Sequence, residues 1–233
     1  MKALLFLLVI LGLSACQDLP TSSHAIVVMY DRTSLETIET PSPDDIWKLW
    51  NQEEEPNDGV YFAYQNIGNT DFNKDIRLEL KSHTDPYANE VERKGAVDKF
   101  TNEVESLIDE QNQLVFEFQH SSIFRPLIKQ LDALSKKDID NKTVLLYSDL
   151  EEHSEYLSWY NKADKKLIQT DPEAAALKLT EGLSIPDFRG VTLRIVHYPK
   201  TTEANTNFNT WIDLYRIAFR DSGLIIIVGN ENE

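Results

Sequence analysis

Four short, mostly apolar runs constrain the fold of this chain more than any other feature. The first, Ala25–Tyr30, is rich in β-branched residues and ends at an acid, Asp31; the others are 143–147, 191–196 and 224–228. A strand with one wet face alternates apolar and polar residues, whereas a strand covered on both faces is apolar throughout. The four runs therefore predict buried strands of a parallel sheet with helices on both of its faces.

The segments between these runs have other periodicities. Residues 90–111 place apolar side chains at helical spacing (Val97, Phe100, Val104, Leu107 and Ile108), and similar patterns predict helices over 121–134, 172–179 and 208–219. A first helical turn begins at Pro43, and residues 59–64 predict a further strand. Residues 75–80 alternate apolar and charged side chains, which is typical of an edge strand. Alternating strands and helices predict one α/β domain, a three-layer sandwich.

The amino terminus has the features of an export signal. Lys2 precedes a short apolar run, and Leu13-Ser14-Ala15 leads into Cys16, the only cysteine of the chain. This segment resembles the lipobox of bacterial lipoproteins, although an ordinary secretory signal with a chance cysteine is the alternative. The resemblance implies a signal peptide over 1–15, a covalent lipid (diacylglyceryl and palmitate-type acyl chains) on Cys16, and a lipidated tether over 16–24.

Lipid on Cys16 implies a location in the cell envelope, with the protein anchored to a lipid membrane. The residue after the cysteine is Gln17 and not aspartate. In the sorting rule known for lipoproteins of double-membrane bacteria, this favours the outer membrane. Because the single cysteine carries the lipid, we expect no disulfide and no thiolate chemistry. No second apolar run in the sequence is long enough for a membrane helix.

The chain is strongly acidic, with a formal net charge of −16 at pH 7. A field of this sign repels nucleic acid, so no nucleic-acid partner is expected. The acidic triplet 53–55 is interpreted as a solvated loop that at most binds calcium loosely. Composition therefore favours a protein partner or a cation over a polyanion.

Polar residues follow two of the buried runs, where the carboxyl ends of parallel strands place ligand sites. Asp31 is followed by Arg32 and Thr33, and Asp149 follows Ser148 at the end of the run 143–147; Ser121 opens the segment 121–127. In this order, the elements resemble the von Willebrand factor type A family and its metal-ion-dependent adhesion site. Asp31, Thr33, Ser121 and Asp149 fall on four of the five motif positions. At the fifth, where the family has a metal-binding serine, this chain has Leu35, and its serine stands one place earlier, at Ser34.

This resemblance implies a von Willebrand A-like domain over 25–233, with a mostly parallel central sheet and one antiparallel edge strand, as in Rossmann-like folds. It also implies a binding module for protein–protein interaction or assembly, in which Asp31, Thr33, Ser121 and Asp149 hold Mg²⁺, Mn²⁺ or Ca²⁺ and a partner's carboxylate completes the coordination. Without a metal, the two aspartates cap helices, Thr33 closes a turn and Ser121 is an N-cap. Both interpretations remain open from the sequence.

Enzymatic motifs are scarce, and the chain is not expected to be an enzyme. The sequence contains no G-x-G-x-x-G, no G-K-[ST] loop, no G-x-S-x-G elbow and no H-E-x-x-H helix. The alternative is a metal-dependent hydrolase that uses His120, Asp149 and His153, with Glu151 and Glu152 beside them. No catalytic residue is assigned outside that alternative.

Overall fold

The computed structural model describes residues 21–33, 38–68, 73–85, 89–114 and 121–229. Cys16, Ser34, Leu35 and His120 lie outside these ranges, so the predictions made for them concern residues that the structure does not describe. The strands are β1 (Ser23–Asp31), β2 (Gly59–Ile67), β3 (Asp75–Leu80), β4 (Asn141–Tyr147), β5 (Val191–Val196) and β6 (Ile225–Val228). The helices are α2 (Pro43–Trp47), α3 (Glu90–Gln113), α4 (Phe124–Ser135), α5 (Lys162–Thr170), α6 (Pro172–Leu179) and α7 (Thr202–Ala218).

All six strands form one sheet in the order β3-β2-β1-β4-β5-β6. Neighbouring strands are parallel, except that β3 pairs antiparallel with β2. The α/β sandwich with a mostly parallel sheet and one antiparallel edge strand is therefore confirmed. In this order β1 and β4 lie side by side at the centre of the sheet, which explains why both are apolar along their length.

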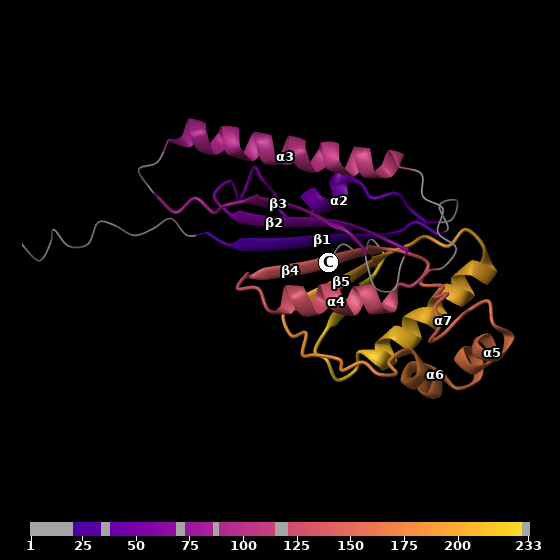
Figure 1. Ribbon diagram of the computed structural model, residues 1–233. Coiled ribbons are helices and arrows are strands. Elements are labelled where there is room, and N and C mark those ends of the chain that lie inside the picture. Colours follow the sequence, from indigo (N-terminus) through magenta and orange to yellow (C-terminus); the bar gives the residue numbers. More distant parts are fainter. Residues whose placement is uncertain (1–20, 34–37, 69–72, 86–88, 115–120, 230–233) are drawn as a thin grey trace, which may run out of the picture.

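Each central strand supplies side chains to two separate cores. Along β1, Ala25, Val27 and Met29 face α4 and α7, while the residues between them face α3. Figure 1 shows the three layers, with α2 and α3 on one face of the sheet and α4, α5, α6 and α7 on the other. Alternate residues of an extended strand point to opposite faces, so one apolar run fills both cores.

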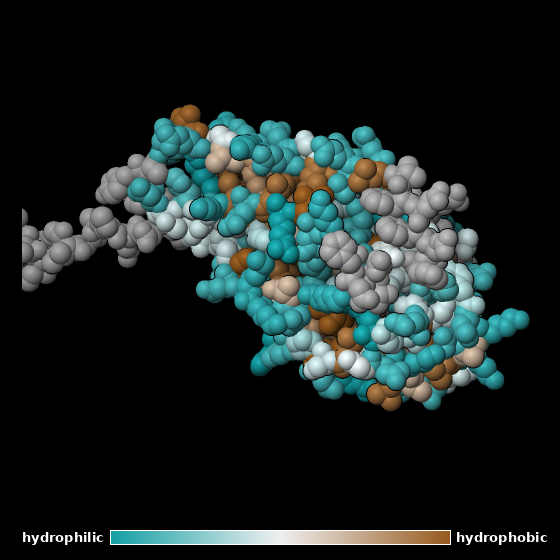
Figure 2. All heavy atoms as spheres, in the orientation of Figure 1, coloured by the Kyte–Doolittle hydropathy of each residue, from teal (hydrophilic) through white to brown (hydrophobic). Residues whose placement is uncertain are grey.

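The helices expose their polar sides to solvent. The outer side of α3 is largely hydrophilic on the face that Figure 2 shows, although Val91 is exposed there. None of the helices in the described part of the chain combines the length and the apolar composition that a bilayer crossing requires.

Four local predictions need correction. The run 224–228 was predicted as a buried strand, but β6 lies at the sheet edge and Ile225 is 54% exposed. Helix α5 was not predicted, because its apolar face is reduced to one buried residue, Ile168. Neither Ser121 nor Ser122 caps α4, whose N-cap residue is Ile123. Strand β1 begins at Ser23, so the last two residues of the predicted tether belong to the sheet.

Gly223 provides a test of the turn that connects α7 to β6. Its φ is +72°, and a Cβ there would collide with the Cγ of Arg189. Gly182 has a φ of +70° but open space around it. Because only Gly223 adds a clash to left-handed strain, we expect Gly223→Ala to lower the free energy of unfolding by roughly 1–3 kcal/mol more than Gly182→Ala. Urea unfolding measures this difference, and equal losses for the two variants would contradict it.

Candidate functional site

The candidate site lies where β1 and β4 end side by side at the carboxyl edge of the sheet. After β1 the chain continues to β2 on one side, and after β4 it continues to β5 on the other. Such a switch in direction leaves a crevice at the strand ends, which is the usual ligand position in open α/β sheets. The last residue of β1 is Asp31, and Ser148 and Asp149 directly follow β4.

Asp31 is completely buried, and hydroxyl groups surround its carboxylate. Thr33 donates to Oδ1 from its backbone N–H at 3.1 Å and from its Oγ1 at 2.6 Å. Ser121 and Ser148 donate from their Oγ atoms to Oδ2 at 3.1 and 2.9 Å. Burial raises the pKa of Asp31, and these hydrogen bonds offset part of that effect. Three of the four predicted residues, Asp31, Thr33 and Ser121, are thus in direct contact.

Asp149, the fourth predicted residue, belongs to the same electrostatic environment. Burial, and secondly the nearby charge of Asp31, raise the pKa of Asp149 to about 7. Its Oδ1 accepts the backbone N–H of Glu151 at 3.0 Å. Among the described residues, no ion pair joins Asp31 or Asp149 to a basic side chain. The edge therefore concentrates negative charge that a cation would compensate.

The backbone is strained immediately after Asp149. Leu150 is buried and has a φ of +64°, in the left-handed region that a leucine rarely adopts. Its N–H is held by the Oγ of Ser148 at 2.9 Å. Backbone strain of this kind persists only where surrounding contacts impose it, and it is found most often at functional sites.

The simpler interpretations of these residues are correct in part. Thr33 does close a turn on Asp31, and Asp149 accepts from a backbone N–H two residues later. Neither aspartate caps a helix of the described chain. Local turns account for these hydrogen bonds, but not for the convergence of two acids and the hydroxyls of Ser121 and Ser148 from three separate segments.

Glu152 has a structural role that the sequence did not reveal. Its Oε2 accepts the backbone N–H groups of Ile123 and Phe124 at 2.9 and 3.0 Å, and so caps α4 from another part of the chain. Burial raises the pKa of Glu152 to about 7. The cap fixes the start of α4, and with it Ser121, beside the end of β4.

The structure does not test the hydrolase alternative, because His120 lies outside the described residues. His153 contacts the Oγ of Ser158 through Nδ1 at 2.7 Å, and its ring packs edge-on against Tyr160. The backbone N–H of His153 donates to the carbonyl of Ser121 at 2.6 Å, which places this loop beside the site. These contacts hold the His153 side chain in place next to the site.

A cavity of about 330 Å³ adjoins the carboxyl edge. Its lining includes Asp149, Glu151, His197, Glu203 and Asn207. Asn207 donates to Glu151 at 3.3 Å, and Nδ1 of His197 lies 3.1 Å from Glu39. The cavity has room for one side chain of a partner next to Asp149.

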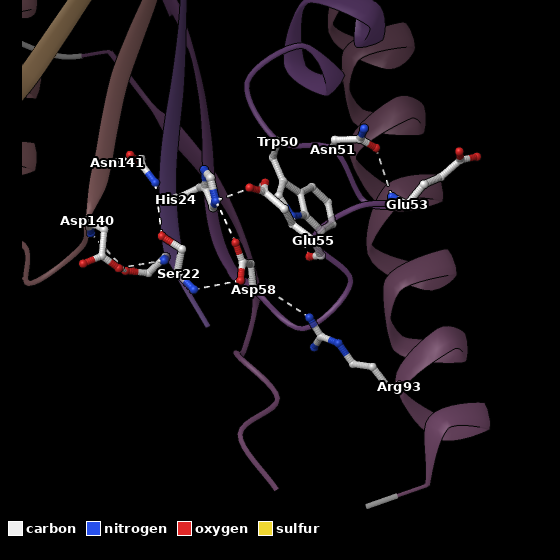
Figure 3. A network of polar contacts seen from close by, with 11 residues as sticks. Ser22, His24, Trp50, Asn51, Glu53, Glu55, Asp58, Arg93, Asp140 and Asn141 are labelled. Carbon is white, nitrogen blue, oxygen red and sulfur yellow. Dashed lines mark hydrogen bonds and ion pairs between the residues drawn. The ribbon is translucent and has the colours of Figure 1, made fainter. Parts of the chain in front are cut away.

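A second group of ligand-type side chains lies at the opposite edge of the sheet. Among the residues that the structure describes, one group has three side-chain ligand atoms close enough to share a metal ion. It consists of His24, Glu55 and Asp58. Figure 3 shows them at the amino ends of β1 and β2. The sequence analysis missed this group: His24 was assigned to the tether and Glu55 to a solvated loop. The acidic triplet was the only signal that pointed to it.

Comparisons with known proteins assign the chain to no family. No family model matches the chain, and no curated protein matches it. Among solved structures it is similar to a mutant of the PilB minor pilin from Streptococcus sanguinis, with 7% identity and a TM-score of 0.48 over 94% of this chain and 59% of the pilin chain. It is also similar to the conserved hypothetical protein BatB from Bacteroides thetaiotaomicron, with 12% identity and a TM-score of 0.33 over 90% of this chain and 91% of that chain. Identities this low do not establish a shared function.

The raised pKa of Asp149 has a consequence for stability. Its carboxyl holds a proton up to about pH 7 in the folded protein but only up to about pH 4 when unfolded. The free energy of unfolding therefore falls as pH rises through this window. Asp149→Asn cannot ionise, so we expect its stability relative to the original protein to increase by roughly 2–4 kcal/mol between pH 4 and pH 8 without divalent ions.

Urea unfolding in the presence of a chelator, repeated across that pH range, measures this difference. Asp187→Asn is the control, because Asp187 is exposed and the hydrogen bond from Arg189 lowers its pKa, so this variant should gain no stability relative to the original protein as pH rises. A stability difference between Asp149→Asn and the original protein that does not change with pH would contradict the prediction.

Proposed function

We propose that this protein is a lipid-anchored binding module of the bacterial cell envelope, of the von Willebrand A-like type, which engages a protein partner through a divalent cation at the carboxyl edge of its sheet. The observation that carries the proposal is the buried carboxylate of Asp31, which accepts three hydroxyl groups and the backbone N–H of Thr33 and stands beside a second acid, Asp149.

The donor set fits a hard cation. Mg²⁺, Mn²⁺ and Ca²⁺ prefer oxygen ligands, and this edge offers two carboxylates and the hydroxyls of Thr33, Ser121 and Ser148. Leu35 removes the serine that the family uses at its fifth position. Ser148, which already donates to Asp31, supplies a further hydroxyl oxygen next to that carboxylate. The ion would offset the repulsion between the two acids and offer a position for a carboxylate of the partner.

The direction of β1 supports binding away from the membrane. The strand begins at Ser23, close in sequence to Cys16, and it ends at Asp31. Asp31 lies seven positions after His24 along the extended strand, which corresponds to roughly 23 Å. A lipid on Cys16 would therefore hold the amino edge of the sheet toward the membrane and leave the carboxyl edge, with its adjoining cavity, open to a partner.

Metal binding tests the proposed site. We expect the full chain in detergent to bind one Mg²⁺ or Mn²⁺ in calorimetry, with a rise in melting temperature that increases with the concentration of the ion. Asp31→Asn should lose that rise, and its metal-free form should be at least as stable as the original protein, because a buried charge has been removed. Asp187→Asn should behave like the original protein.

Two results would overturn the metal site. One is the absence of any binding of Mg²⁺, Mn²⁺ or Ca²⁺ at millimolar concentration. The other is binding that persists undiminished in both Asp31→Asn and Asp149→Asn. A structural effect of the substitutions is separated from loss of ligation by the melting temperature measured with a chelator present.

Lipidation is tested independently of the metal. In a bacterial host supplied with labelled palmitate, we expect the chain to incorporate label and to sediment with outer membranes, whereas Cys16→Ala should lose both properties. Ser14→Ala keeps a small residue in the same segment and serves as the control. Release of the original protein into the soluble periplasmic fraction would refute the anchor.

A further inference from the structure

We propose that His24, Glu55 and Asp58 form a second metal site, suited to zinc or a similar divalent transition ion, at the amino edge of the sheet. The site goes beyond the proposed function and does not depend on it. Its residues come from β1 and from the loop that leads into β2.

The three ligand atoms lie close enough together to share one metal ion. Nε2 of His24 lies 3.0 Å from Oδ2 of Asp58 and 3.6 Å from Oε2 of Glu55, and all three atoms lie within 4.8 Å of one another. In a tetrahedral zinc site with bonds of about 2.0–2.1 Å, neighbouring ligands are about 3.3–3.4 Å apart. Small shifts of the side chains would therefore bring each atom to bonding distance of one ion.

The chemistry of the donors selects the kind of ion. One imidazole nitrogen with two carboxylates suits zinc and its neighbours in the first transition series, whereas magnesium and calcium are held by oxygen ligands. Three protein ligands leave a fourth position for water, as in zinc sites that are open to a substrate. The group thus differs in type from the oxygen-only carboxyl edge.

Hydrogen bonds fix the backbone of the loop that carries both acids. Arg93, from α3, donates through three nitrogens to the backbone carbonyls of Pro56, Lys81 and Asp58 at 2.5, 2.6 and 2.7 Å. Trp50 donates from Nε1 to the carbonyl of Glu55 at 3.3 Å. Figure 3 shows this arrangement around the loop. A site whose ligands are already fixed binds an ion without a large ordering cost.

The carboxylate of Asp58 is oriented by its own second contact. Its Oδ1 accepts the backbone N–H of Ser22 at 2.7 Å, which leaves Oδ2 directed toward His24. Metal-binding carboxylates are commonly oriented by such outer contacts. His24 and Asp58 are each 6% exposed, so the pair is shielded from water and held in place.

An entry path leads to the group. The side chain of Glu55 is 45% exposed, and an open depression of about 400 Å³ is lined by Ser22, Glu54, Glu55 and Asp58. An ion could reach Nε2 of His24 from solvent on the side of Glu55. The acidic residues at the rim favour the approach of a cation.

The test is zinc binding by the full chain in detergent, measured by calorimetry and by the visible absorption of Co²⁺ as a substitute. We expect one equivalent of zinc to bind and the cobalt spectrum to show tetrahedral coordination that includes nitrogen. Glu55→Gln, at an exposed position, should weaken zinc at least tenfold with an unchanged metal-free melting temperature. His24→Gln should abolish the site.

Glu53→Gln is the matched control, because Glu53 belongs to the same acidic triplet and in Figure 3 its side chain points away from His24. It should leave zinc affinity unchanged. Equal effects of Glu53→Gln and Glu55→Gln, or no zinc binding by the original protein, would overturn the proposal and leave His24 as an ion-pair partner of two acids.

The two proposed metal sites can be tested independently of each other. Asp31→Asn should keep zinc binding and lose the effect of magnesium, whereas His24→Gln should do the reverse. Zinc binding that disappears in Asp31→Asn but not in His24→Gln would assign the ion to the carboxyl edge and refute the site at the amino edge.

Discussion

The buried carboxylate of Asp31 is the constraint on which the rest of this molecule depends. It lies at the end of the central strand β1 and is completely buried. A buried charge destabilises the folded state unless polar groups surround it. Ser121 and Ser148 reach it from segments more than 80 residues away, so the start of α4 and the end of β4 must both meet β1 there. The cap that Glu152 places on α4 holds the same junction together.

Burying these acids at the edge of the sheet lowers stability. Asp149 and Glu152 stay partly protonated near neutral pH because they are buried near other acids. A sheet edge built only for stability would carry neutral or paired groups at these positions. Unpaired acids, hydroxyls and the strained backbone of Leu150 together give the edge the character of a cation site. The opposite edge adds an imidazole to its two acids, so the two ends of the sheet differ in the ions they suit.

Local patterns in the sequence predicted most of the fold. The uninterrupted run 25–30 required cover on both faces, and the alternation of 75–80 required one wet face, which places β1 inside the sheet and β3 at its edge. Asp31 and Asp149 were found as candidates because polar residues after buried strands meet at one edge of a parallel sheet. Strand order was not available from these patterns, so β6 was predicted as buried although it lies at an edge.

The sequence by itself determined most of the strands and helices, though not α5, and where the acids follow the strands. Periodicity and strand ends are properties of a few consecutive residues. Only the tertiary structure decided which distant groups meet. It brought Ser148 to Asp31, Glu152 to α4, and Glu55 to His24. The physical reason is that a repeating pattern fixes the face of a helix or strand on which a side chain lies. The residue that this side chain contacts depends on the order in which the strands are placed in the sheet.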